Sequence, residues 1–253
     1  MDSEPFAYPP LQTFDPAASA TEQPLSSVRY PSRRPLRAIV DESGYFATRQ
    51  GSATITAALR GSTATFYSDD GFRFRHPQSD IDIVALTEGV GSVIGARYLF
   101  YSVTSLPPVA RDMDVLCFSP ACLVREQATA RRIFLTTKLI QPGIPVCNAP
   151  IYHQLKMQAM AILILRGLAR RRLHRVTPSG AARLVLEEDH FAEPWRWLSL
   201  RTYYVDAPSA PAQRANLTRW AGAALELLAA HGRAVEVTRE YAAPAEPVYL
   251  LYP

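Results

Sequence analysis

The chain has 253 residues, of which 48% are hydrophobic and 20% are charged, an ordinary balance for a globular protein. A chain of this length forms one large domain or two small ones. Its longest apolar run, residues 159–165, is far shorter than the roughly 18 residues of a membrane span, so we expect no membrane partner. The opening residues are acidic and rich in proline, unlike a secretory signal, which favours a cytoplasmic protein.

The net charge of +4 and the pI near 9.0 suit a partner that carries phosphate groups. The three cysteines, Cys117, Cys122 and Cys147, form no CxxC pair and have no histidine at zinc-ligand spacing. The sequence also contains no Walker-type loop and no serine hydrolase elbow. The chemistry must therefore be sought in other patterns.

Residues 1–35 are rich in proline and small polar residues without sustained periodicity, and we expect a disordered N-terminal arm there. In residues 36–149, short apolar runs alternate with longer helix-like stretches, which predicts a mixed α/β layer. An Asp70-Gly71 pair between aromatic-rich stretches predicts a hairpin. Three of the short apolar runs are expected strands: residues 80–86, 113–118 and 143–147.

Residues 150–253 are expected to be mainly helical. A long helix after Pro150 has an apolar middle that must be buried and an arginine-rich end that suits the negative end of the helix dipole. A second helix is expected from about Ala212 to Ala230, and it should stop at Gly232. Together with the preceding core, this predicts an α+β protein.

Two aspartates stand out in "HPQSDIDIVAL", residues 76–86. Alternate residues of a strand point to the same face, so Asp80 and Asp82 should project side by side, about 6.6 Å apart along the chain. Magnesium prefers a few carboxylate oxygens supplemented by water and substrate phosphates, and these two residues could form half of such a site. The alternative is a half-buried edge strand whose polar face is acidic. Because polar residues precede the pair and an apolar run follows, both carboxylates lie at the beginning of the strand.

With "LRGSTA" upstream, this pattern resembles the nucleotidyltransferase superfamily of the DNA polymerase β type. That family has a Gly-Ser pair, then a DxD motif flanked by apolar residues, then a third carboxylate on a later strand. Gly61-Ser62 matches the first element, "SDIDIVA" the second, and Asp114 in "ARDMDVLCF" the third. The resemblance covers about residues 57–148. It implies a mixed-sheet core flanked by helices, with a helix between the strands of Asp82 and Asp114, another helix before residues 143–147, and a helical C-terminal segment.

Two assignments within this resemblance stay open. Seventeen residues separate Ser62 from Asp80, more than the family usually shows; an inserted hairpin would explain the excess, and Gly51-Ser52 is the other, more distant Gly-Ser candidate. Asp112 lies on the same predicted strand face as Asp114 and is an alternative third carboxylate.

The resemblance implies a metal-dependent nucleotidyltransferase, which moves a nucleoside monophosphate from a nucleoside triphosphate to an acceptor hydroxyl and releases pyrophosphate. The catalytic Asp80, Asp82 and Asp114 would hold two Mg²⁺ ions, about 3.5–4 Å apart in such sites, and Asp114 would favour deprotonation of the acceptor. Gly61 and Ser62 would contact the phosphates. A small alcohol, an RNA end and a protein hydroxyl are all compatible acceptors.

Lys156 near the start of the long helix could reach the triphosphate as a compact point charge, and a solvated surface lysine is the alternative. The rival to an enzyme is a nucleotidyltransferase-fold module that binds or regulates without an operative metal triad.

Overall fold

The computed structural model describes residues 40–61, 64, 67–68, 71–72, 80–88, 96–103, 111–119, 130–192, 200–206, 210–237 and 246–252. The chain divides into two compact units. Unit 1 consists of residues 1–127 and 141–154, and unit 2 of residues 128–140 and 155–253. No helix in the described ranges is long and apolar enough to cross a membrane.

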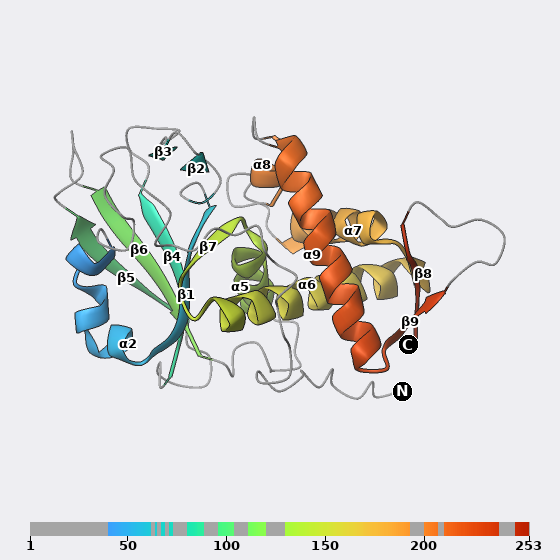
Figure 1. Ribbon diagram of the computed structural model, residues 1–253, viewed down its shortest axis with the longest axis horizontal. Helices are drawn as coiled ribbons and strands as arrows, with labels where there is room; N and C mark the ends of the chain where they lie inside the picture. The colour runs from blue at the N-terminus through green and yellow to red at the C-terminus, as the bar shows by residue number, and fades with distance from the viewer. Residues whose placement is uncertain are drawn as a thin grey trace. The chain divides into compact units, whose positions relative to one another are not determined.

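Unit 1 is built on a five-stranded mixed sheet in the order β5-β6-β4-β1-β7, which Figure 1 shows. Strands β4 and β6 are parallel neighbours, whereas the other neighbouring pairs are antiparallel. With the helices described below, this confirms the predicted α+β class. The strands are β1 (Thr54–Arg60), β4 (Ile81–Thr87), β5 (Ala96–Val103), β6 (Arg111–Phe118) and β7 (Gly143–Cys147).

The three strands expected from apolar runs are present as β4, β6 and β7. The helix expected between the strands of Asp82 and Asp114 is wrong for the described part of that interval, since Ala96–Val103 forms β5. This segment pairs antiparallel with β6 along its whole length. The three aromatic residues and the valine in "ARYLFYSV" suit a pleated strand better than a helix, which explains the difference.

One face of the sheet carries an apolar core. Alternate residues of each strand point toward it, as the two-residue period of a strand requires, and Tyr45 of the 3₁₀ helix η2 (Tyr45–Ala47) packs on them. The Tyr45 hydroxyl lies 2.6 Å from Thr54 Oγ1, which satisfies its polar end within the core. The buried members of this face are Val40, Tyr45, Ala57, Leu59, Ile81, Ile83, Ala85, Met113, Val115, Cys117, Ile144 and Val146.

The predicted hairpin is present as β2 (Tyr67–Ser68) and β3 (Gly71–Phe72), which pair antiparallel. Gly71 pairs with Ser68, so it is the first residue of β3 rather than the second residue of an Asp-Gly turn. Residues 69 and 70 lie outside the described ranges.

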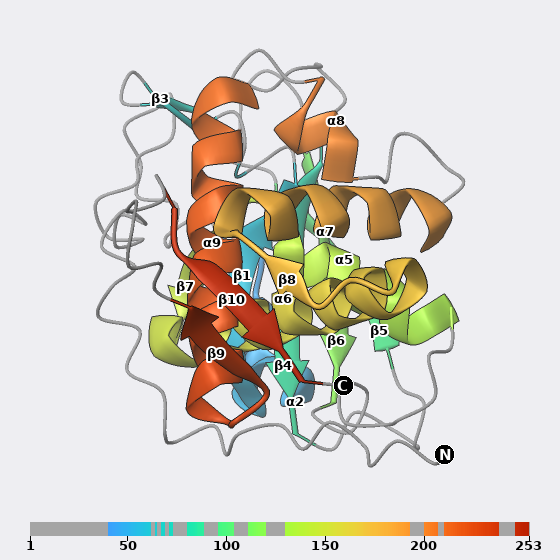
Figure 2. The ribbon, with the colours of Figure 1, turned by 90° about the vertical axis from the view of Figure 1, so that its right-hand side faces the viewer.

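Unit 2 combines helices with a small sheet, seen in Figure 2. Helix α6 (Ala149–Arg171) begins in unit 1 and continues into unit 2, and it confirms the long helix expected after Pro150. Helix α9 (Ala210–Ala230) confirms the second one, and Gly232 follows its end with a positive φ of 67°. The amides of Gly232 and Arg233 donate to the Ala229 and Leu228 carbonyls, the pattern of a glycine-terminated helix end.

The other elements of unit 2 complete this arrangement. Helix α7 (Pro178–Ala192) begins with proline at its first position, where the missing amide hydrogen costs nothing. Buried Glu188 of α7 forms ion pairs with Arg166 and Arg170 of α6, each at 3.4 Å, which join the two helices. The remaining elements are α5 (Ala130–Ile140), α8 (Leu200–Tyr204) and the sheet β8-β10-β9, formed by Arg175–Val176, Val248–Leu251 and Ala234–Val237.

Candidate metal centre

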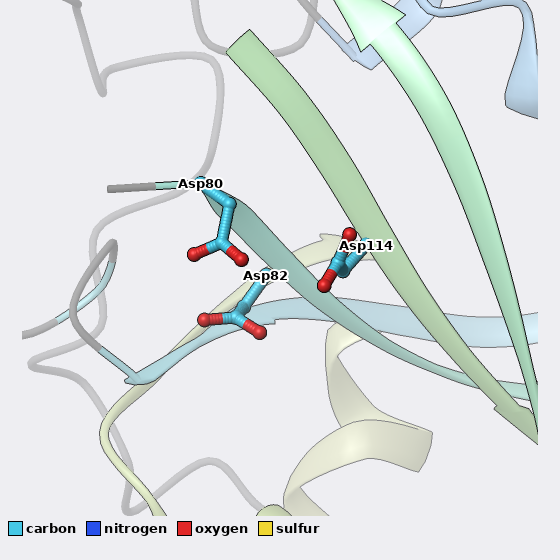
Figure 3. A group of neighbouring side chains, drawn as sticks. All are labelled: Asp80, Asp82 and Asp114. Atoms are coloured by element: carbon cyan, nitrogen blue, oxygen red, sulfur yellow. The ribbon is translucent and has the colours of Figure 1, made fainter. Parts of the chain in front are cut away.

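Three carboxylates converge at one end of the parallel strands β4 and β6. Each of Asp80, Asp82 and Asp114 offers an oxygen atom that lies within 4.8 Å of the oxygens offered by the other two. Figure 3 shows the three carboxylates close together, with Asp80 directly before β4, Asp82 in β4 and Asp114 in β6. We call these three residues the acidic cluster. It is half-buried, so its carboxylates are held by the fold and remain open to a solute.

The strand pattern explains why the cluster forms. Ile81 and Ile83 are fully buried in the core, and the alternation of a strand therefore turns Asp82 to the opposite face. On β6, Met113 and Val115 are buried in the same core and turn Asp114 the same way. Parallel pairing then sets Asp82 directly beside Asp114, because these two residues are partners in the register. The sequence interpretation placed these residues together, and the geometry agrees with it.

Crowding gives the cluster an unusual electrostatic state. Burial, followed by the charges of Asp80 and Asp82, raises the pKa of Asp114 to about 6 from an ordinary value of 3.8. The guanidinium of Arg60 lowers the pKa of Asp114, but by less than these effects raise it. Like charges disfavour one another's ionised form, so a cation bound among the three carboxylates would relieve their repulsion.

Arg60 is the residue of this site that the sequence interpretation missed. It is the last residue of β1, only 5% exposed, and its Nη2 lies 2.8 Å from Asp82 Oδ1. Its Nη1 donates to Gln141 Oε1 at 3.4 Å. Antiparallel pairing of Leu59 with Ile83 places Arg60 beside Asp82. The only sequence signal was its position next to Gly61, because the pairing of β1 with β4 cannot be read from local pattern.

Of the predicted Gly-Ser pair, the structure describes Gly61, and Ser62 lies outside the described residues. Gly61 is buried, directly follows Arg60 and has a φ of 65°, a left-handed conformation that favours glycine. The alternative Gly-Ser pair, Gly51-Ser52, has a glycine for a reason of packing. A Cβ on Gly51 would lie 1.9 Å from the Tyr45 carbonyl oxygen, so packing requires glycine there.

Two further candidates from the sequence, Asp112 and Lys156, remain to be placed. Asp112 belongs to β6 and pairs with Ser102 in the register, while its side chain lies outside the described part. Asp114 is the carboxylate found in the acidic cluster. Lys156 belongs to unit 2, where it is 2% exposed with its Nζ 4.8 Å from the centroid of the Trp220 ring. The alternative of a solvated lysine is therefore wrong, and contact of Lys156 with a triphosphate stays a prediction.

The residue types and spacing of the acidic cluster fit a hard divalent cation. Oxygen ligands at about 2.1 Å from Mg²⁺ lie about 3 Å apart when adjacent and about 4.2 Å apart when opposite. A set of oxygens within 4.8 Å needs only small side-chain rotations to reach these separations. Carboxylate oxygens are ligands that both Mg²⁺ and Ca²⁺ accept, so the acidic cluster suits a cation of this class.

Searches against protein-family models and against curated proteins found no match to this chain.

Proposed function

We propose that this protein is a metal-dependent nucleotidyltransferase that moves a nucleoside monophosphate from a nucleoside triphosphate to an acceptor hydroxyl. The observation that carries the proposal is the acidic cluster itself: Asp80 lies directly before β4, and Asp82 of β4 and Asp114 of β6 are partners in the register. Their order along the chain, after a buried glycine at the end of β1, matches the family that the sequence resembles.

In this proposal, Asp80, Asp82 and Asp114 would hold two magnesium ions, which when bound would neutralise triphosphate charge and acidify the acceptor hydroxyl. Arg60 keeps one Asp82 oxygen in place through its ion pair, so that carboxylate is already oriented before a ligand arrives. Gly61 allows the backbone to approach the phosphates closely.

The reaction forms a bond between the acceptor oxygen and the α-phosphorus. It breaks the bond from that phosphorus to the bridging oxygen, and pyrophosphate leaves with the electron pair. Asp114 receives the proton of the acceptor hydroxyl. A general base must lie within reach of the proton it takes, and Asp114 of β6 lies directly beside Asp82 in the register, on the face that carries the acidic cluster.

One observation favours the rival, a non-catalytic binding or regulatory module. The buried guanidinium of Arg60 neutralises part of the cluster without any metal. If Arg60 takes the place of a metal ion in the cluster, a bound nucleotide would be held by arginines and backbone donors, and its binding would not depend on magnesium. Three carboxylates within reach of one cation still favour catalysis, because a single arginine leaves the cluster with excess negative charge.

Calorimetric titration of each common nucleoside triphosphate, with magnesium and then with chelator, tests the proposal. Without the cation the carboxylates and phosphates repel one another, so we expect magnesium to strengthen binding substantially. Asp114→Asn should lose this dependence, whereas Asp206→Asn, which changes an exposed aspartate outside the sheet, should keep it. Equal binding with magnesium and with chelator would support the non-catalytic module and contradict the enzyme.

A further inference from the structure

An exposed pair of aromatic rings lies on the edge strand of the sheet. Tyr98 and Phe100 of β5 are 41% and 72% exposed. Their ring centroids are 6.5 Å apart and the ring planes are inclined by only 18°, so the two rings stack. We call these two residues the aromatic pair. Large rings at this exposure do not contribute to the core, and their neighbours Leu99 and Tyr101 pack against it instead.

The register brings the aromatic pair to the acidic cluster. Phe100 is the partner of Asp114 in the antiparallel pairing of β5 with β6. Directly opposite residues share a face of the sheet, with Cβ atoms about 5 Å apart. Phe100, Asp114, Asp82 and Arg60 therefore form one row across β5, β6, β4 and β1 on the same face. An exposed ring stands beside the carboxylate that we assign to the acceptor.

Strand order indicates which substrate lies on the side of the aromatic pair. Gly61 follows β1, and β1 and β5 lie on opposite sides of the β4–β6 pair that carries the acidic cluster. In nucleotidyl transfer, the attacking and leaving oxygens are roughly in line through the phosphorus. If the leaving pyrophosphate lies toward Gly61, the attacking hydroxyl must approach from the opposite side. That side carries Asp114 and Phe100, so the aromatic pair lies where the acceptor would bind.

We propose that the aromatic pair is an acceptor subsite that stacks the terminal nucleobase of a single-stranded nucleic acid, with its 3′ hydroxyl directed to Asp114. This inference rests on the proposed function and names its acceptor class. An aromatic ring beside the reacting group suits a planar base, and base stacking on aromatic side chains tolerates any base. The net charge of +4 favours a polyanionic acceptor over a neutral alcohol or a protein. A single strand is required because the bases of a duplex are already stacked and paired.

The test measures equilibrium binding of the whole chain to a fluorescein-labelled RNA hexamer, in magnesium and without triphosphate, so that no transfer occurs. A matched hexamer carries an abasic 3′-terminal nucleotide, which keeps the sugar and phosphates and removes the base. Wild type, Phe100→Ala and Phe100→Trp are compared. Tyr252→Ala is the control, because Tyr252 is an aromatic side chain of unit 2 with a comparable exposed fraction of 47%.

We expect wild type to bind the intact hexamer about 10-fold more tightly than the abasic one, since one stacked base contributes on this scale. Phe100→Ala should bind both hexamers equally, and Phe100→Trp should restore the preference. Tyr252→Ala should behave as wild type. A wild-type protein without preference for the intact hexamer, or a Phe100→Ala variant that retains it, would overturn the subsite.

A label-transfer assay distinguishes an error in the acceptor subsite from an error in the proposed function. Wild type and Phe100→Ala are given radiolabelled triphosphates with the RNA hexamer, a tyrosine-containing protein and a small polyol as acceptors. Preferential transfer to the RNA by wild type, reduced in Phe100→Ala, supports the subsite. Transfer to the protein or the polyol at equal rates by both forms would overturn the subsite and leave the nucleotidyltransferase standing. Triphosphate binding that magnesium does not strengthen would contradict the function itself.

Discussion

Arg60 Nη2 lies 2.8 Å from Asp82 Oδ1, and this ion pair joins β1 to the acidic cluster on β4 and β6. The arginine side chain is 6% exposed and the aspartate side chain 18%, so water screens the pair only partly. Asp114 lies beside Asp82 but experiences mainly burial and repulsion, as its raised pKa indicates. Two neighbouring carboxylates of one site therefore have opposite energetic roles in the metal-free protein.

Asparagine substitutions should separate these roles. In the proposed function Asp82 and Asp114 are metal ligands, so we expect Asp82→Asn and Asp114→Asn each to lower transfer at least about 100-fold. Asp114→Asn should raise the metal-free stability, because it removes a repelling charge. Asp82→Asn should lower it, because buried Arg60 loses its ion-pair partner. Urea unfolding with chelator measures stability, and shifts of the same sign in both variants would contradict this assignment.

Substitution of Arg60 tests the ion pair between Arg60 and Asp82 by removing its cation. Arg60→Met keeps most of the apolar stem but leaves the acidic cluster without this cation, and we expect a loss of about 2 kcal/mol in chelator. Magnesium should recover part of the loss, because it supplies positive charge to the same carboxylates. Arg171→Met is the control, since its ion pair with Glu187 joins side chains that are 42% and 35% exposed. Exposed pairs contribute at most about 1 kcal/mol, so an equal loss in both variants would show that Arg60 has no special role.

The raised pKa of Asp114 predicts how stability depends on pH. The pKa of Asp114 is 3.8 in the unfolded chain and about 6 in the folded protein, so between these values the folded protein binds more protons. The contribution of Asp114 to the free energy of unfolding should therefore decrease as pH rises through this interval and stay constant above it. Urea unfolding in chelator, compared between wild type and Asp114→Asn, isolates this contribution. A difference between the two that does not vary with pH would contradict the crowding that we infer.

Two glycine substitutions should have opposite effects on stability. A Cβ at Gly51 would lie 1.9 Å from the Tyr45 carbonyl oxygen, so Gly51→Ala must displace backbone, and we expect a loss of about 2 kcal/mol. In helix α9, a Cβ at Gly222 would meet Pro178 side-chain carbons at 3.7 Å, an ordinary contact. Gly222→Ala should therefore gain about 0.5–1 kcal/mol from helix propensity. Thermal unfolding of both variants checks this prediction, and a stabilised Gly51→Ala would refute the packing role.

The sequence predicted those parts of the fold whose signal is local. Apolar runs located β4, β6 and β7, and helical periodicity located α6 and α9. Asp80 and Asp82 shared a face because a strand has a two-residue period, and Asp114 followed from the order of motifs. Strand β5 was missed because "ARYLFYSV" has apolar or aromatic residues on both of its faces, so no alternation of polar and apolar residues was visible.

Arg60 and Phe100 could not be assigned from the sequence for a different reason. Each is an unremarked residue of its own strand, and each gains meaning only from the residue opposite it on the neighbouring strand. Strand order and register depend on tertiary packing, and a single sequence does not state them.

The parallel pairing of β4 with β6 also bears on how the chain folds. Asp82 and Asp114 become neighbours only after the chain between positions 82 and 114 has closed into a loop that includes β5. Closing such a loop costs chain entropy before the new contacts repay it, and non-local strand pairing slows folding for this reason. A newly made chain whose central strands have not yet paired therefore has no acidic cluster. Any cation binding that needs all three carboxylates therefore requires that the central strands have paired.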